Sequence, residues 1–192
     1  VSNPSNQINT ETSERLIRYL VKHQHWSPLE MVNACLEIET TRDIAHQIVR
    51  HRSFAFQEFS QRYANPEEQG DMFEYSEARL QDTKNRQNSI ETSDVELQAW
   101  WDAQQKFVTE ISKKIYDEAL KKGIAKEQAR KVLPEGLTKT KLYMNGTLRS
   151  WIHYIDLRSA NGTQKEHMEI AHACAKVIAG IFPLMSELQQ GE

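Results

Sequence analysis

The chain has 192 residues, of which 39% are hydrophobic and 27% are charged, and its formal net charge is −3. This length suits one domain with a proper core, and the small negative charge excludes a general electrostatic attraction to nucleic acid or anionic membranes. No apolar run reaches the roughly 20 residues that a membrane-spanning helix needs. We therefore expect a globular protein with neither nucleic acid nor membrane as a partner.

The two cysteines, Cys35 and Cys174, are far apart in the sequence and form no metal-type spacing. This usage favours free thiols in a reducing compartment, so we expect a cytoplasmic protein with both thiols packed in its interior. His23 and His25 could join Cys35 as metal ligands, but their spacing matches no standard zinc pattern. The sequence predicts no metal site.

In chain order, the spacing of apolar residues first predicts a helix over about 14–23, capped by Ser13, and then an alternating strand over 31–39. Thr40 or Thr41 opens a second helix. Residues 64–93 are rich in Asn, Gln and Ser, which predicts strand fragments joined by long loops.

The second half of the chain is more helical. The elements predicted there are a long helix over 94–121, a short helix over 125–132, a strand over 137–144, and helices over 147–157 and 164–182. Strands and helices follow one another without a regular βαβ rhythm. The pattern therefore favours an α+β domain over a doubly wound one.

Residues 50–63, RHRSFAFQEFSQRY, place arginines, a histidine and a glutamate among aromatic side chains. If the segment is a strand, Glu58, Ser60 and Arg62 share a face with its phenylalanines. The preceding helix would bring Gln47, Arg50 and His51 onto one side, because residues three and four apart are neighbours on a helix.

Such donors, acceptors and fixed cations suit an anionic, planar ligand, since guanidinium groups clamp phosphate oxygens while amides and hydroxyls bind ring edges. The alternative is an edge strand with solvated charges, next to a helix end that its cations stabilise. These residues alone leave both interpretations open. Neither GxGxxG nor GxxxxGK[ST] occurs, so the sequence offers no Rossmann or P-loop nucleotide site.

A second group of polar residues lies on the helix predicted from NGTLRSWIHYIDLR. Arg149, His153 and Asp156 lie opposite its apolar side, which is formed by Leu148, Trp151, Ile152 and Ile155. Arg158 follows at the helix end, and a further cation, Arg130, precedes KVLP. An ordinary amphipathic helix would also explain this pattern.

The segment RHRSFAFQEFS fits the RHR-x7-S signature of the flavin-dependent thymidylate synthases (ThyX), and the chain resembles that family. The resemblance extends in order through HWSPLEM (25–31), Gln47, NRQNS (85–89), ARKVLP (129–134) and LRSWIHYIDLR (148–158). Two features depart from the family pattern. Such proteins usually begin with a further strand and helix before the position of Val1, and Gln57 stands where asparagine is common.

The resemblance implies a single ThyX-like catalytic domain over 1–192 that lacks its first strand and helix. Its implied fold is a twisted, mostly antiparallel sheet flanked by helices. Its implied reaction converts dUMP to dTMP, with methylenetetrahydrofolate as the one-carbon donor and reduced FAD, regenerated by NADPH, as the hydride donor. A homotetramer with shared active sites is also implied.

The resemblance also assigns residues by position. The flavin set, implied to bind FAD, comprises Ser2, His25, Ser27, Glu30, Arg50, His51, Arg52, Glu58, Thr147, Leu148, Arg149 and His153. The nucleotide set, implied to bind dUMP, comprises Gln47, Arg50, Glu58, Ser60, Arg62, Arg130 and Arg158. Arg158 is the implied catalytic residue, placed against the uracil ring.

Two alternatives to a synthase remain open from the sequence. One is a binding module that holds a nucleotide or single-stranded nucleic acid on its arginine and aromatic face. The other is a family member that binds flavin but has lost synthase activity.

Overall fold

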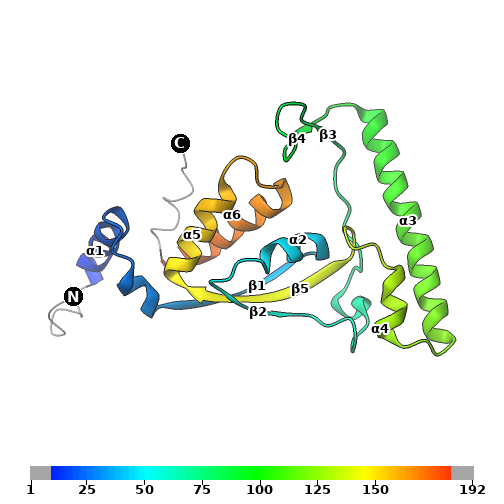
Figure 1. The fold of residues 1–192 in the computed structure, drawn as a ribbon, viewed down its shortest axis with the longest axis horizontal. Coiled ribbons are helices and arrows are strands. Elements are labelled where there is room, and N and C mark those ends of the chain that lie inside the picture. The colour runs from blue at the N-terminus through cyan, green and yellow to red at the C-terminus, as the bar shows by residue number, and fades with distance from the viewer. Residues whose placement is uncertain (1–9, 183–192) are drawn as a thin grey trace. The chain divides into compact units, whose positions relative to one another are not determined.

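The computed structural model describes residues 10–182 of the chain (Figure 1). The α-helices are α1 (Thr10–Lys22), α2 (Arg42–Ile48), α3 (Val95–Lys121), α4 (Lys126–Ala129), α5 (Leu148–Ser159) and α6 (Lys165–Ala179). The strands are β1 (Asn33–Thr41), β2 (Ala55–Glu58), β3 (Arg79–Gln81), β4 (Ser89–Glu91) and β5 (Lys139–Thr147), and short 3-10 helices are η2 (Ser27–Met31), η3 (Pro66–Gln69) and η4 (Arg130–Val132).

The main sheet has three strands in the order β1-β5-β2. Just beyond one end of the β1–β5 pair, the main-chain N–H of Arg42 donates to the carbonyl of Thr138. Just beyond the other end, the N–H of Leu148 donates to the carbonyl of Val32. Residue numbers therefore increase along one strand where they decrease along its neighbour, so the pair is antiparallel. Strands β3 and β4 form a separate antiparallel pair. The predicted α+β class with antiparallel sheet is confirmed.

The chain forms two compact units. The first contains Val1–Leu36, Ser53–Ala55 and Asn145–Glu192, and the second contains Glu37–Arg52 and Phe56–Met144. Strands β1, β2 and β5 each contribute residues to both units.

In the first unit, α5 packs against α6 (Figure 1). Trp151 and Ile155 of α5 are fully buried, and the Trp151 indole N–H is donated to the Ala34 carbonyl at 3.0 Å. The buried Tyr154 hydroxyl lies 3.1 Å from the imidazole of His167 on α6. The apolar side predicted for this helix is confirmed.

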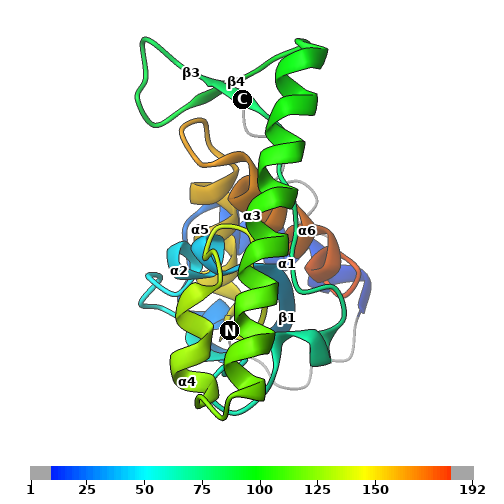
Figure 2. The same ribbon diagram turned by 90° about the vertical axis from the view of Figure 1, so that its right-hand side faces the viewer.

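In the second unit, α4 lies beside the C-terminal part of α3 (Figure 2). Met72, Tyr116 and Ala129 form a buried apolar cluster there. The predicted long helix is confirmed as α3. Its helical spacing was given by Trp100, Phe107, Ile111, Ile115 and Ala119. The first four are exposed, and Ala119 packs against the buried cluster. The buried side chains of α3 include Gln105 and Thr109.

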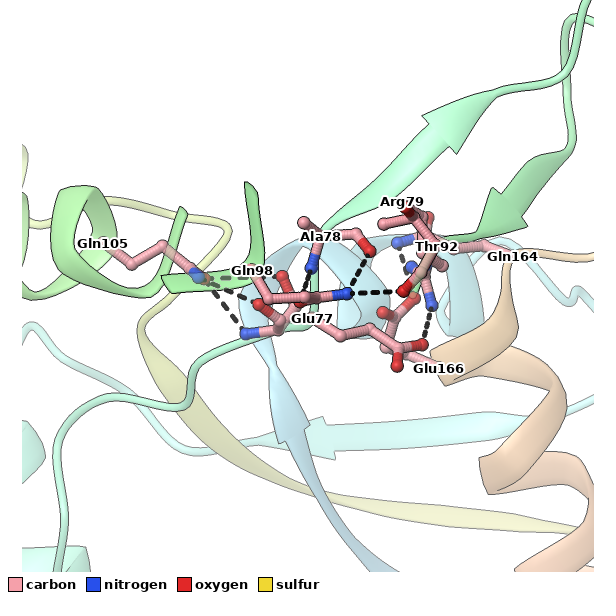
Figure 3. Close-up of polar contacts among 9 residues, drawn as sticks. Glu77, Ala78, Arg79, Thr92, Gln98, Gln105, Gln164 and Glu166 are labelled. Carbon is pink, nitrogen blue, oxygen red and sulfur yellow. Dashed lines mark hydrogen bonds and ion pairs between the residues drawn. The ribbon is translucent and has the colours of Figure 1, made fainter. Parts of the chain in front are cut away.

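Two glutamines of α3 hold an extended segment of the chain (Figure 3). The Gln98 amide accepts from the main-chain N–H of Ala78 at 2.8 Å and donates to the carbonyl of the same residue at 2.9 Å. The Gln105 amide forms the same pair of bonds with Ser76, at 3.0 and 2.9 Å. Each glutamine therefore satisfies a main-chain donor and acceptor much as a neighbouring strand would.

Several predicted boundaries shift by a few residues. The first helix begins at Thr10, so Ser13 lies inside it and is not its cap. The second helix is confirmed, with Thr41 as the residue before its first turn. Among residues 10–182, no helix combines the length and the apolar character that crossing a membrane requires.

Candidate functional site

The segment 50–63 is mostly not a strand. Only Ala55–Glu58 pair as β2, and α2 ends at Ile48, before Arg50 and His51. The carbonyl of Ser60 accepts the amide of Tyr63 at 3.1 Å, which closes a turn directly after the strand. The predictions that Ser60 and Arg62 continue the strand, and that Arg50 and His51 lie on the helix, are wrong for this reason.

Within β2 the predicted alternation is confirmed. Phe56 and Glu58 are half-buried, whereas Ala55 and Gln57 are exposed. Glu58 therefore ends the strand on its inward-facing side, where it can reach the neighbouring elements.

The Glu58 carboxylate is held by two side chains of the second unit. Its Oε1 accepts from Arg42 Nη1 at 3.1 Å and from Thr140 Oγ1 at 2.9 Å. Thr140, on β5, is buried, and the Arg42 side chain is only 19% exposed. One carboxylate oxygen thus has both a cation and a neutral donor, so Glu58 has a fixed position.

Arg42 also faces a second carboxylate. Its Nε lies 3.7 Å from Glu135 Oε1, and the same oxygen lies 3.2 Å from His46 Nε2. Arg42 begins α2 immediately after β1. It therefore joins the start of a helix, the end of β2 and the loop before β5.

A pocket of about 220 Å³ opens beside these residues. Its lining is Arg42, Gln61, Arg130, Lys131, Leu133, Glu135 and Thr138. Gln61 is 3% exposed, and its Nε2 has no hydrogen-bond partner among the described residues. Three cations and a buried amide donor without a partner are the groups that would accept an anionic, oxygen-rich ligand.

Arg62 lies at the edge of this region. Its guanidinium contacts Glu127 on α4, with Nη2 3.2 Å from Oε2, and both side chains are about half exposed. Such an exposed pair contributes little to stability. The guanidinium can therefore exchange this carboxylate for a ligand phosphate at low cost.

The structure brings the two flavin-set segments of the first unit together. Arg149 on α5 forms an ion pair with Glu30 on η2. The His153 ring, one turn further along α5, lies 4.7 Å from the Trp26 ring. Segments 119 residues apart in sequence thus meet through a charged and an aromatic contact.

The start of α5 is fixed by its own residues. The Thr147 hydroxyl caps the helix by accepting the amide of Ser150 at 3.2 Å. Leu148 is buried, and its amide is donated to the Val32 carbonyl at 2.7 Å. Both residues position the helix start, and their contact with flavin stays a prediction.

The remaining members of the two sets are mostly accessible. His25, Ser27, Arg50 and Arg52 are exposed, while Gln47, His51, Ser60, Arg130 and Arg158 are half-buried. Ser2 lies outside the described residues. Arg158 was predicted to follow the end of this helix and instead lies in the last turn of α5, which extends to Ser159.

The two thiols differ in their surroundings. Cys174 is buried, and burial raises the pKa of its thiol to about 12. It is therefore protonated at neutral pH and is a poor nucleophile. The prediction of a packed thiol holds for Cys174 and is wrong for Cys35, which lies on the exposed face of β1.

Sequence reasoning missed Arg42, Thr140, Trp26 and Glu127. Arg42 is 16 residues from Glu58, and Thr140 is 82 residues from it, so no local spacing relates them. One signal was present for Thr140. In TKTK (138–141) the threonines alternate with lysines, which places them on the inner face of the strand.

The residues fit FAD by the chemistry of their donors. The exposed guanidinium groups of Arg50 and Arg52 suit a diphosphate. The Arg149–Glu30 pair and the His153 and Trp26 rings offer donors, acceptors and aromatic surface for a flavin ring.

Comparisons with known proteins show the family to which the chain belongs. The family model described as thymidylate synthase complementing protein matches residues 1–184. The chain is 49% identical over 187 residues to the probable flavin-dependent thymidylate synthase of Paramecium bursaria Chlorella virus 1, which covers 97% of this chain and 85% of the viral protein. It is 50% identical over 186 residues to the flavin-dependent thymidylate synthase of Synechocystis sp. This match covers 97% of this chain and 83% of the Synechocystis protein.

A solved structure shares the fold. The UMP/dUMP methylase PolB from Streptomyces cacaoi, crystallised with 5-Br dUMP, superposes with a TM-score of 0.77 and 24% sequence identity, covering 94% of this chain and 81% of that one. The chain belongs to the thymidylate synthase complementing protein family, and its relatives in it are flavin-dependent thymidylate synthases.

Proposed function

We propose that this chain is a flavin-dependent thymidylate synthase that converts dUMP to dTMP. Methylenetetrahydrofolate is the proposed one-carbon donor and NADPH the proposed reductant. We treat residues 1–192 as one catalytic domain of a cytoplasmic enzyme. FAD, when bound, would supply the hydride that completes the methyl group.

The observation that supports the proposal is the grouping of the nucleotide set. All its members except Arg158 belong to the second unit. Within that unit, Arg130 and the neighbour of Ser60, Gln61, line one cationic pocket. A nucleotide monophosphate needs such a combination of cations and neutral donors.

The proposed roles follow from the chemistry of each side chain. Arg62 and Arg130 bind the phosphate, to which a guanidinium can donate two parallel hydrogen bonds. Ser60 donates a hydrogen bond to the nucleotide, and Gln47 offers an amide donor and acceptor to it. Glu58 supplies an acceptor next to both the nucleotide and the flavin.

Arg158 is the proposed catalytic residue. Its cation lies against the uracil, where it favours ionisation at N3 and makes C5 richer in electrons. A fixed positive charge raises the rate when it stabilises the transition state more than the ground state. The reaction needs no enzyme thiol, which agrees with the protonated state of Cys174.

The flavin set would hold FAD through two groups of residues. The cations at 50–52 are proposed to bind the flavin ring and nearby phosphate. The segments 25–30 and 147–153 are the second proposed flavin-binding group. The ion pair between Glu30 and Arg149 supports this by fixing both segments.

We propose a homotetramer with shared active sites. Helix α3 supports this proposal, because Trp100, Phe107, Ile111 and Ile115 are between 44% and 60% exposed in the single chain. Exposed apolar side chains that gather on one helix are typical of an interface between subunits.

Anaerobic turnover tests the function directly. The purified protein, loaded with FAD, is incubated with dUMP, NADPH and methylenetetrahydrofolate, and dTMP is measured by chromatography. We expect dTMP only when all three are present, and formation slower by orders of magnitude with the Arg158→Ala variant. A protein that binds FAD and oxidises NADPH but forms no dTMP would instead be a flavin-binding relative without synthase activity.

A further inference from the structure

The Glu58 carboxylate is bound unevenly. Its Oε1 accepts from both Arg42 Nη1, at 3.1 Å, and Thr140 Oγ1, at 2.9 Å. Its Oε2 has no hydrogen-bond partner among residues 10–182. A carboxylate can accept about four hydrogen bonds, so half of its capacity is left for a ligand.

Arg42 is itself fixed on several sides. Its main-chain amide is donated to the Thr138 carbonyl at 3.0 Å, and its guanidinium lies between the carboxylates of Glu58 and Glu135. Its side chain is 19% exposed, in contrast to 53% for Arg62. The Arg42 side chain is thus an anchored cation, and it also lines the cationic pocket with Arg130.

We infer that Arg42 and Thr140 are positioning residues for nucleotide binding: they hold the Glu58 carboxylate by one oxygen and leave the other for the ligand. The inference rests on the proposed function, in which Glu58 contacts the nucleotide. Two donors on one oxygen restrict the rotation of the side chain, so the free oxygen is presented in one direction before the ligand arrives.

Charge gives Arg42 a second role. A dUMP phosphate and a carboxylate repel each other, and the site must therefore balance the charge of Glu58. The Arg42 cation at 3.1 Å supplies this balance without occupying Oε2. Without Arg42 the Glu58 carboxylate would keep only the neutral Thr140 donor, and its negative charge would face the nucleotide without a bound cation.

Two pairs of variants test the inference in the full chain loaded with FAD. Arg42→Met removes the cation and keeps a long side chain, while Arg42→Lys keeps a cation. Thr140→Val removes the hydroxyl with little change of shape, while Thr140→Ser keeps it. The dUMP dissociation constant is measured by titration calorimetry, together with KM, kcat and the unfolding temperature.

We expect Arg42→Met to weaken dUMP binding by about 10- to 100-fold and Thr140→Val by about 3- to 10-fold. Arg42→Lys and Thr140→Ser should recover most of the affinity. Lys113→Met is the matched control. Lys113 also bridges two carboxylates of the second unit, Glu67 at 2.6 Å and Asp117 at 2.8 Å, without contacting Glu58, so dUMP affinity should not change.

The same substitutions in a Glu58→Ala background, which removes the oxygen that Arg42 and Thr140 bind, separate positioning from general stabilisation. If Arg42 acts through Glu58, Arg42→Met should change dUMP affinity less than about twofold there, because coupled residues are not additive. An equal loss in both backgrounds would overturn the inference. Should Arg42→Met fail to fold, the Thr140→Val cycle decides in the same way.

The wild-type protein separates the two levels of failure. If it binds no dUMP and forms no dTMP, the proposed function is wrong and the inference falls with it. If the wild type is active and Arg42→Met binds dUMP equally well, only the inference is wrong.

Discussion

Arg62 has two partners to choose from: the Glu127 carboxylate, which it contacts in the structure, and the nucleotide phosphate, which we propose it binds. Because the pair with Glu127 is exposed, it competes weakly with a doubly charged phosphate. The proposed binding role of Arg62 can therefore be measured separately from its role in the fold.

We predict that Arg62→Ala weakens dUMP binding far more than FAD binding. The loss of a hydrogen bond to a charged group costs about 1.5–3 kcal/mol, or about 10- to 150-fold in affinity. Calorimetric titration with each ligand measures the two losses. Glu127→Gln is the control, since it removes the ion pair but keeps the guanidinium, and it should change dUMP affinity less than threefold. Equal losses for both ligands in Arg62→Ala would show that Arg62 is not specific to the nucleotide.

Ser60 and Arg158 should separate binding from catalysis. A serine nucleophile needs a base within hydrogen-bond reach, and we instead expect Ser60 to donate to the nucleotide. Ser60→Ala should therefore raise the dUMP KM and leave measurable turnover. Arg158→Ala should lower kcat by orders of magnitude with flavin still bound, because its charge acts mainly in the transition state.

Steady-state kinetics and flavin absorbance on both variants check this prediction. The opposite result, in which Ser60→Ala abolishes turnover at saturating dUMP while Arg158→Ala remains active, would reverse the roles. A covalent serine mechanism would then need to be considered.

For single residues, the sequence predicted which side chains belong to the candidate site better than it predicted which side chains contact one another. Signature matching assigned Glu58 and Arg149 to a ligand site, and the structure gives both of them charged partners. It could not predict Arg42 as the partner of Glu58, because that contact depends on how the end of β2 meets the start of α2. Periodicity describes one element at a time and carries no such information.

Among the elements, β5 and the segment before β2 approach each other closely at Gly146. A Cβ built on Gly146 would overlap the ring of Phe54. That ring also contacts Trp151 edge-on, with centroids 4.9 Å apart. Glycine is needed here for space, since the aromatic ring takes the place that a side chain would fill.

We predict that Gly146→Ala lowers the free energy of unfolding by about 1–3 kcal/mol, the usual cost of overpacking a core. Urea unfolding followed by circular dichroism measures the change. Gly136→Ala serves as the control, because the nearest atom to its added Cβ would be Asp43 Oδ2 at 4.0 Å. It should differ from wild type by less than about 0.5 kcal/mol. Equal stability of the two variants would contradict the proposed close approach.

Helices and strands were predicted correctly where one side of the element is buried, and incorrectly where a turn determines the end of the element. Helix α5 was predictable because its apolar residues lie on one buried side, as the complete burial of Trp151 shows. The strand expected to continue through Ser60 and Arg62 was too long, because alternation continues in sequence beyond Glu58 while the turn at Ser60 ends the pairing. The hydrogen bonds from Gln98 and Gln105 to the main chain could not be predicted from a hydrophobic pattern, because both side chains are polar.

For the whole molecule, most of the apolar residues whose spacing predicted α3 do not lie on the buried side of the helix. The residues that made it recognisable as a helix are largely exposed, while Gln105 and Tyr116 on its other side are buried. A helix with apolar residues on both sides is expected where two surfaces are covered. We propose that another copy of the chain covers the exposed apolar side of α3.

We predict that the wild-type protein is a tetramer at micromolar concentration and that the double substitution Phe107→Glu and Ile111→Glu dissociates it. Both side chains are exposed in the single chain, at 60% and 44%, so the substitutions should not disturb the fold of a subunit. In an apolar interface, however, an unpaired carboxylate loses its hydration without a partner. Light scattering measures the mass, and circular dichroism checks the fold.

Lys114→Glu is the matched control for that double variant. Lys114 is exposed on the same helix and is already polar, so its substitution should leave the tetramer intact. Because the active sites are proposed to be shared, the dissociated double variant should also lose dTMP formation while each subunit stays folded. A tetramer that survives both glutamates would move the interface away from α3. A wild-type monomer with full activity would contradict shared sites altogether, because every residue that the reaction needs would then have to come from one chain.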